Sequence, residues 1–353
     1  MIRIGIVGCN YGRLVHLPAF RRDPRCEVIA LAGTDKARTA ELAGAAGIPL
    51  AFGNWEDLVA HADVDAVTIA APPRLQPPIA LRALALGKPV FAEKPIAASL
   101  ADAEAMARTA ADSGLATMVD FNFSAVPAFR KAKELLDQDA IGQLRHVSVN
   151  WQVENHSTRL RLKNWKTAGA DGGGALGNFV SHSFHYLEWL CGPITGLSAR
   201  LTGLPDAPEM ETGASIGLRF ASGAAGQLTM SCASFLGSGH RLELYGGDGT
   251  LTLTNPSQDY MRGFELHHAR RPATALARVE IDDPLDRLFP ADGRIAPVSR
   301  LAAAFLDAIV EKRISMPGFA EGLRVQTLLE AARRAHDSGC WLDIGPNSTE
   351  TRA

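Results

Sequence analysis

Short apolar runs alternate with amphipathic segments along the first part of the chain. Apolar or β-branched runs occur at residues 2–8, 26–32, 64–71, 88–93 and 115–121. Segments with the helical spacing of apolar residues separate them, at 14–22, 35–47, 76–87 and 99–114. Three of these segments end in a glycine, a common helix stop. Strands and helices that alternate at these lengths predict βαβ units around a parallel sheet.

The pattern changes after residue 120. A helix is expected at 126–139, a strand at 143–153 and a second helix at 177–190, after a glycine-rich turn. Strand-like runs with turn signals follow, at 215–220, 225–233, 240–247, 250–255 and 264–270. Their spacing is typical of an antiparallel sheet. A polar, proline-containing segment around 282–297 predicts a surface loop, and helices are expected at 298–312 and 320–339.

The predicted fold is therefore α/β with two parts. Residues 1–120 are expected to form a Rossmann-type, doubly wound parallel sheet, and residues 121–353 an α+β domain with a large open, mainly antiparallel sheet.

Composition narrows the class of protein. The chain has 353 residues, 46% hydrophobic and 21% charged, with a formal net charge of −2. This charge gives no electrostatic reason to expect nucleic acid or a membrane surface as a partner. No apolar run is long enough to span a membrane, and the first strand-like run begins too early for a signal peptide. Five scattered cysteines without a CxxC pair argue against a disulfide framework or a zinc site and suit the cytoplasm.

The first strand runs into Gly8-Cys9-Asn10-Tyr11-Gly12-Arg13 and then into a helix. A dinucleotide fingerprint needs glycine where the backbone turns tightly toward the pyrophosphate. Gly8 fits this need, and Asn10, at the second glycine position, tolerates left-handed backbone better than most residues. Gly12 lies one place early for the third glycine. The turn predicts a dinucleotide site, with a phosphate-free tight turn as the alternative.

A second motif lies on the helix expected after the glycine-rich turn. Asn178, His182, His185 and Trp189 follow one another at i, i+4, i+7 and i+11, which is one helix face. Polar groups on such a face are compatible with a metal site, a catalytic base or two hydrogen-bonded core histidines. The sequence of this helix alone does not distinguish these three interpretations.

Two further motifs are more specific: the stretch FAEKPIA at 91–97 and the pattern GGGALxxxxSH at 172–182. With them the chain resembles the Gfo/Idh/MocA family of sugar and inositol oxidoreductases over nearly its whole length. The resemblance implies NADP or NAD as cofactor and no metal. It implies that Lys94 acts at the nicotinamide and the substrate oxygen, that Glu93 shapes the cofactor site, and that His182 is the catalytic histidine. Asn178 and His185 stand where the family has aspartates, and His185 is equally explained as a core histidine.

The same resemblance extends to further residues. It implies that the cofactor contacts Gly8, Cys9, Asn10, Tyr11, Gly12, Arg13, Thr34, Asp35, Arg38, Ala71, Pro72, Leu75, Gln76, Glu93, Lys94 and Asn122. It implies a substrate pocket that includes Lys94, Trp165, Asn178, His182 and His185, although Trp165 is as well explained by packing beneath the glycine turn. A homodimer or homotetramer through the C-terminal sheet is expected, because relatives often pair this sheet with its copy.

The end of the second strand bears on which dinucleotide binds. NAD sites usually carry an acidic residue there, and this chain has Gly33 followed by Thr34 and Asp35. A glycine leaves room for a 2′-phosphate, which Thr34, Lys36 and Arg38 could receive at a helix start. NADP is favoured on this basis. In the competing interpretation Asp35 reaches the ribose and selects NAD, and in a third it only caps the helix.

The resulting hypothesis is an NAD(P)-dependent dehydrogenase or reductase that acts on a secondary hydroxyl or carbonyl of a sugar, an inositol or a related cyclic polyol. An NAD-dependent glycosidase and a non-catalytic, cofactor-sensing regulator of the same fold are the alternatives. The presence of both Lys94 and His182 argues against the regulator, whereas Asn178 and His185 keep it open.

Overall fold

The protein is described here by a computed structural model, which covers residues 1–257 and 259–345. It divides into two compact units. Unit 1 comprises Met1–Asn122 and Arg294–Gln326, and unit 2 comprises Phe123–Gly293 and the chain from Thr327 onward. Compactness does not establish independent folding, so the division into domains 1–120 and 121–353 stays a prediction. Within the described part of the chain, no helix is long and apolar enough to cross a membrane.

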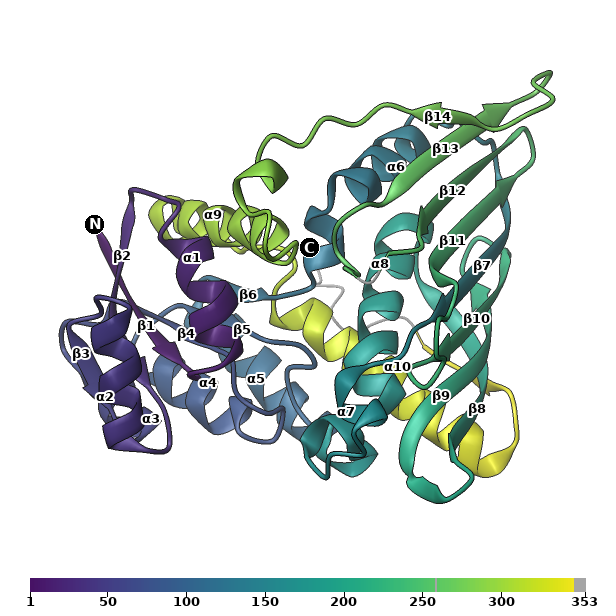
Figure 1. The fold of residues 1–353 in the computed structure, drawn as a ribbon. Coiled ribbons are helices and arrows are strands. Elements are labelled where there is room, and N and C mark those ends of the chain that lie inside the picture. The colour runs from purple at the N-terminus through teal and green to yellow at the C-terminus, as the bar shows by residue number, and fades with distance from the viewer. Residues whose placement is uncertain (258, 346–353) are drawn as a thin grey trace. The chain divides into compact units, whose positions relative to one another are not determined.

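Unit 1 is built on a six-stranded sheet in the order β3-β2-β1-β4-β5-β6 (Figure 1). Every adjacent pair of strands is parallel. The strand order reverses between β1 and β4, as a doubly wound sheet requires, so the predicted fold class is confirmed. The strands are β1 (Ile2–Val7), β2 (Cys26–Ala32), β3 (Leu50–Phe52), β4 (Ala66–Ile69), β5 (Val90–Ala92) and β6 (Thr117–Val119).

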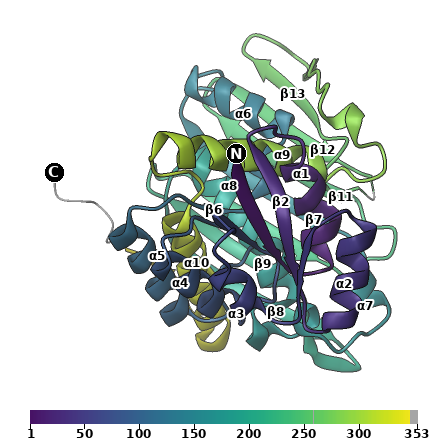
Figure 2. The same cartoon turned by 90° about the vertical axis from the view of Figure 1, so that its left-hand side faces the viewer.

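Helices cover this sheet on both faces. Helices α3 and α5 pack with α4 beside the sheet, whereas α1 packs with α9 (Figure 2). Helix α5 shows the local cause well, because the Ser99 side chain accepts the Asp102 N–H at its start and Gly114, at φ 64°, ends it. The helices are α1 (Leu17–Phe20), α2 (Lys36–Ala45), α3 (Trp55–Ala60), α4 (Gln76–Ala85), α5 (Leu100–Ser113) and α9 (Ile295–Glu311).

Unit 2 is built on a nine-stranded sheet in the order β14-β13-β12-β11-β7-β10-β9-β8-β15. Its neighbours are antiparallel except for β7 and β10, so the mainly antiparallel sheet is confirmed. The strands are β7 (Leu144–Gln152), β8 (Ile194–Leu204), β9 (Ala207–Phe220), β10 (Ala225–Ser231), β11 (Gly239–Gly246), β12 (Gly249–Asn255), β13 (Glu265–Arg270), β14 (Ala277–Val279) and β15 (Leu342–Asp343).

The buried side of unit 2 is rich in aromatic rings. Phe123 contacts the rings of Phe129, Trp151 and Tyr186, and His240 stacks on Trp151 with centroids 4.2 Å apart. Such contacts add to the free energy gained by burying the rings. The helical segments of unit 2 and α10, which runs across the division, are η2 (Asn122–Ala125), α6 (Pro127–Asp137), α7 (His156–Arg159), η3 (Trp165–Thr167), η4 (Gly169–Asp171), η5 (Leu176–Val180), α8 (Ser181–Cys191), η6 (Asp286–Leu288) and α10 (Phe319–Ser338).

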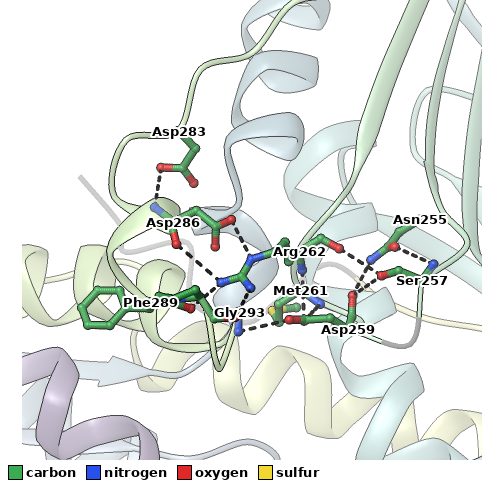
Figure 3. Close-up of polar contacts among 10 residues, drawn as sticks. Asn255, Ser257, Asp259, Met261, Arg262, Asp283, Asp286, Phe289 and Gly293 are labelled. Carbon is green, nitrogen blue, oxygen red and sulfur yellow. Dashed lines mark hydrogen bonds and ion pairs between the residues drawn. The ribbon is translucent and has the colours of Figure 1, made fainter.

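The segment expected as a surface loop around 282–297 is more ordered than its composition suggests. Its last residues are helical, because α9 begins at Ile295. Arg262 binds the part of the segment that precedes α9. Its Nε donates to Asp286 Oδ2 at 2.8 Å, and its Nη1 donates to the Pro290 carbonyl at 2.8 Å (Figure 3). Asp259 accepts the Gly293 N–H at 3.1 Å. The β12–β13 connection thus holds this segment in place.

Candidate cofactor and active site

The turn after β1 leaves no space for side chains at its two glycines. Gly8 has φ 120°, and a Cβ there would collide with the Ala70 carbonyl oxygen, whereas one at Gly12 would lie 2.7 Å from the Ile6 side chain. The chain therefore needs glycine at both positions to bring the turn against β1 and β4. This is the close approach that a pyrophosphate site requires, so the turn fits a dinucleotide.

The helix that follows this turn begins with a π-helical turn, Gly12–His16, before α1. The sequence pattern predicted an ordinary α-helix here. Single π-turns are rare and occur often at functional sites. The wider turn directs His16 into the interior, where its side chain is fully buried.

At the end of β2, Asp35 behaves as a helix cap. Its side chain accepts the Arg38 N–H at 3.0 Å, and Thr34 and Arg38 are exposed. A Cβ on Gly33 would lie 2.5 Å from Thr39 Oγ1 and 2.6 Å from Cys9 Sγ. An acidic residue at position 33 would therefore displace its neighbours.

The connection after β4 contributes Ala71, Pro72, Leu75 and Gln76. Leu75 is exposed, whereas Gln76 is fully buried and its Nε2 donates to the Pro95 carbonyl at 2.8 Å. Gln76 Oε1 and Asn122 Oδ1 are buried and make no hydrogen bond within the described chain. Buried oxygens without a donor suit a site where a ligand supplies one.

Glu93 and Lys94 follow β5 directly. The Lys94–Pro95 peptide bond is cis, and the Lys94 N–H donates to Glu93 Oε2 at 3.3 Å. Both side chains are only partly buried. The parallel strands of this sheet end at one edge, so the glycine turn, Gln76, Glu93 and Asn122 belong to the edge at which doubly wound sheets bind dinucleotides.

A buried ionisable cluster lies at the same edge. His16 Nε2 lies 3.0 Å from Glu93 Oε1 and 3.9 Å from Asp120 Oδ2, so its hydrogen bond is to Glu93 and Asp120 acts through its charge. His16 Nδ1 hydrogen-bonds Thr68 Oγ1, and the Tyr11 hydroxyl donates to Asp120 Oδ2 at 3.3 Å. Elements far apart in sequence thus converge on one imidazole.

The cluster shifts the pKa of each member. Burial would lower the pKa of His16, but Asp120 and Glu93 outweigh it and raise that pKa to about 9. Burial would raise the pKa of Glu93, but the hydrogen bond and charge of His16 hold it below its usual range. Burial and the charge of Glu93 raise the pKa of Asp120 to about 7. Near neutral pH, His16 is therefore an imidazolium between an ionised and a half-ionised carboxyl.

The three donor atoms of this cluster lie within 4.8 Å of one another, close enough to hold a metal ion. Hydrogen bonds already occupy both ring nitrogens of His16, one of them to Thr68. The three side chains form a proton-sharing network, in which Asp120 Oδ1 is buried and makes no hydrogen bond within the described chain.

In unit 2, the helix with the candidate catalytic residues also begins with a π-turn, η5, which continues into α8. The predicted i, i+4 alignment of Asn178 with His182 assumed regular α-helix, and the π-turn changes that register. His182 is buried and its ring lies edge-on to Phe123, 5.0 Å between centroids. His185 is buried as well, and burial lowers its pKa to about 3, which favours the interpretation of a neutral core histidine.

Asn178 uses its amide in a way that the sequence did not reveal. Its Nδ2 donates to the Lys166 carbonyl at 2.6 Å and to the Gly174 carbonyl at 2.9 Å. Trp165 is half-buried, and a Cβ on Gly173 would collide with its carbonyl oxygen. The glycine turn thus rests on the Trp165 backbone, and the role of the Trp165 ring stays a prediction.

Sequence reasoning missed the cluster around His16. Asp120 stood inside the apolar run at 115–121 and His16 between apolar residues of the predicted helix at 14–22, where a polar residue is the informative exception. A search for ionisable residues inside predicted buried elements would have found both.

Comparison with known proteins agrees with this geometry. Residues 2–121 match the family described as "Oxidoreductase family, NAD-binding Rossmann fold", and residues 129–252 match the "GFO/IDH/MocA C-terminal domain". An uncharacterized oxidoreductase of Synechocystis sp. is 32% identical over 97% of this chain and 96% of its own. Levoglucosan dehydrogenase of Pseudarthrobacter phenanthrenivorans is 24% identical over 97% and 98%.

A solved structure of levoglucosan dehydrogenase in complex with NADH superposes with a TM-score of 0.85 at 21% identity, covering 98% of this chain and 99% of that one. At this identity the likeness concerns the fold. The two family matches together cover more than half of the chain. The first spans all six strands of the sheet of unit 1, and the second begins before β7 and ends within β12. The chain therefore belongs to the Gfo/Idh/MocA family of NAD-binding oxidoreductases.

Proposed function

We propose that this oxidoreductase transfers a hydride between a nicotinamide dinucleotide and a secondary hydroxyl, or the matching carbonyl, of a sugar, an inositol or a related cyclic polyol. The observation that carries the proposal is the Glu93–Lys94–Pro95 turn at the edge of an NAD-binding Rossmann sheet. The relative named levoglucosan dehydrogenase supports this substrate class.

When bound, the dinucleotide supplies the group that accepts or returns the hydride. The chain has to hold the substrate and move one proton. Lys94 takes the hydroxyl proton during oxidation and returns it during reduction, which requires a pKa well below the usual value of about 10.4. Desolvation and a positive nicotinamide ring both act in that direction.

His182 holds the same hydroxyl as a hydrogen-bond partner and relays its proton. In the family pattern an aspartate stabilises the imidazolium of this histidine, whereas Asn178 carries no charge. Both amide hydrogens of Asn178 Nδ2 are committed to carbonyl oxygens. The burden of proton transfer therefore falls on Lys94 in this chain.

NADP is the proposed preference between the two dinucleotides. The position of the usual acidic ribose ligand is Gly33, and Asp35 is engaged as the cap of α2. Thr34 and Arg38 are exposed at the start of that helix, where a 2′-phosphate could be received, although Arg38 also pairs with Glu41 at 2.6 Å. The family description and the NADH complex of the structural neighbour concern NAD and leave this preference to experiment.

The proposal is tested by a screen for reduced nicotinamide absorbance with inositols, aldoses, ketoses and their acids, each with NADP⁺ and NAD⁺. We expect turnover with at least one compound, and a higher kcat/KM with NADP⁺. A clear advantage for NAD⁺ would reject the preference and point to Asp35 as the ribose ligand. Free-sugar oxidation with net cofactor turnover also separates a dehydrogenase from a glycosidase and from a regulator.

The Lys94→Ala variant tests the proposed mechanism, with the compound found in this screen as the substrate. Loss of a general base should lower kcat by about 10²–10⁴-fold while dinucleotide binding persists, because the glycine turn is untouched. Lys131→Ala, which removes a surface lysine paired with Glu134, is the control and should keep full activity. A Lys94→Ala enzyme with near-normal kcat would reject the assignment.

We also propose a cytoplasmic homodimer or homotetramer formed through the nine-stranded sheet. The sheet leaves alternate side chains of β10 exposed, which provides a face for such pairing. Light scattering on the purified protein gives the particle mass, and a monomer would reject the proposal.

A further inference from the structure

We propose that His16, Glu93 and Asp120 form a proton-sharing cluster that sets the preference of this protein between oxidised and reduced cofactor. The proposal rests on the placement of the nicotinamide beside the Glu93–Lys94 turn, which is part of the proposed function. It adds a role for two residues, His16 and Asp120, that the mechanism above does not use.

The geometry supports a single electrostatic unit. His16 and Asp120 are almost completely buried, whereas the Glu93 side chain is 14% exposed and is the member that a ligand can approach. Glu93 also holds the turn through its bond to the Lys94 N–H. A change in the charge of the buried pair is therefore transmitted to the residue at the cofactor edge over short distances.

The charged groups that face the cluster come from several elements of unit 1. Lys94 acts electrostatically on Glu93, and the Tyr11 hydroxyl binds Asp120. The guanidinium of Arg294 lies 5.3 Å from the centre of the Tyr11 ring. From strands β4 and β5, the neutral side chains of Thr68 and Phe91 contact His16.

The cluster changes charge as the pH passes neutrality. At acidic pH the imidazolium of His16 balances the carboxylate of Glu93, and Asp120 is protonated, so the net charge is zero. The pKa of Asp120 is raised to about 7 by burial and by Glu93, and the pKa of His16 is raised to about 9 by the two carboxylates despite its burial. Between about pH 7 and about pH 9 the cluster therefore carries one negative charge.

This charge distinguishes the two forms of the cofactor. An oxidised nicotinamide ring is a cation and a reduced ring is neutral, so a negative cluster attracts only the oxidised form. The affinity for oxidised cofactor relative to reduced cofactor should rise as the pH increases through 7. Bound to this protein, the dinucleotide would thus be held in its oxidised form more strongly in mildly alkaline solution than in mildly acidic solution.

The test measures binding and needs no substrate. Isothermal titration gives the dissociation constants of the oxidised and reduced dinucleotide at about pH 6 and about pH 8. For the wild-type protein we expect the ratio of reduced to oxidised dissociation constants to increase by about fivefold, from one unit charge at short range in a partly screened site.

Two variants should move the ratio in opposite directions. Asp120→Asn keeps only the His16–Glu93 pair, so the ratio should stay low at both pH values. His16→Gln leaves two carboxyls that share one proton, so the ratio should be high at both. At about pH 6 His16→Gln exceeds the wild type, and at about pH 8 Asp120→Asn falls below it. Glu104→Gln removes an exposed carboxylate of α5 and should behave as the wild type.

The measured outcomes distinguish a failure of this proposal from a failure of the proposed function. If none of the proteins binds dinucleotide, the placement of the cofactor is wrong and the proposal falls with it. If the wild type binds and its ratio does not depend on pH, the proposal is overturned while the proposed function stands. If a variant does not fold, NMR spectra of the wild type with ¹⁵N-labelled histidine test the proposal instead. An imidazolium His16 at about pH 7 supports the cluster, and a neutral ring overturns it.

Discussion

Glu211 and Arg333 form an ion pair that fixes both ends of the glycine turn in unit 2. Glu211 Oε2 lies 2.9 Å from Arg333 Nη1, and the same carboxylate accepts the Leu176 N–H at 2.8 Å through Oε1. Arg333 Nη2 donates to the Gly169 carbonyl at 3.1 Å. Strand β9 and helix α10 therefore hold the backbone that leads into η5 and α8, the segment with His182.

Breaking this pair should loosen the turn. Glu211→Ala removes the acceptor of the Leu176 N–H and leaves Arg333 without its carboxylate, which should lower the free energy of unfolding by about 2–4 kcal/mol. Glu211→Gln keeps an acceptor and should cost about half as much. Urea unfolding followed by tryptophan fluorescence reports on unit 2, because only Trp55 of the five tryptophans lies outside it. Equal stability of Glu211→Ala and wild type would contradict the role of the pair.

The glycine turn itself should not tolerate a methyl group. A Cβ on Gly173 would overlap the Trp165 carbonyl oxygen, a backbone atom that cannot rotate away. We expect Gly173→Ala to destabilise unit 2 by about 3 kcal/mol or more, or to be recovered only as aggregate. Gly44→Ala in helix α2 is the contrasting variant, since nothing lies near its Cβ position, and it should stabilise by about 0.5–1 kcal/mol. A well-folded Gly173→Ala with wild-type stability would show that the turn can shift.

Asn178 is not a neutral substitute for the family aspartate. Aspartate has no hydrogen to donate to the carbonyl oxygens of Lys166 and Gly174, so Asn178→Asp should cost about 2–3 kcal/mol at neutral pH. Facing two carbonyls, the new carboxyl should have a raised pKa, so the loss should be smaller near pH 4, where it is protonated and can donate one bond. Asn178→Ala serves as the uncharged control, with a loss that does not depend on pH. An Asn178→Asp protein as stable as the wild type at pH 7 would rule out this reading of the amide.

The fold was largely predictable because the apolar residues follow the strand and the helix periodicity closely. Alternation of buried strands with glycine-terminated helices predicted the order of unit 1, apart from β3 and α3. Their three and six residues are too short to give a pattern. Strand β8 escaped prediction because its Ile194–Leu204 sequence mixes small and polar residues, and β9 was predicted eight residues too short at its start for the same reason.

Candidate site residues could be predicted only where they belong to a motif with fixed sequence spacing. Glu93-Lys94-Pro95 and the glycine turn fall into this class. The partners of Asn178 and the convergence of His16 with Asp120 depend on tertiary contacts between residues as much as 104 positions apart in the sequence, which no periodicity encodes. The two π-turns were also missed, since an inserted residue leaves the apolar spacing of a helix nearly unchanged.

The protonation of His16 should also be visible in stability, independently of any ligand. A group whose pKa is higher in the folded state stabilises that state at pH values below its unfolded pKa, and the contribution is lost as the pH rises through the folded value. For His16 the pKa rises from 6.5 to about 9, so the wild type should lose on the order of 3 kcal/mol between about pH 6.5 and about pH 9. In His16→Gln this loss should be absent, so the stability gap between the two proteins should narrow by a similar amount over that range. His156→Gln, at an exposed histidine of α7, is the control and should leave the pH dependence unchanged. Urea unfolding at both pH values measures the gap, and a gap that stays constant would mean that His16 is neutral in the folded protein and that its bond to Glu93 is an ordinary one.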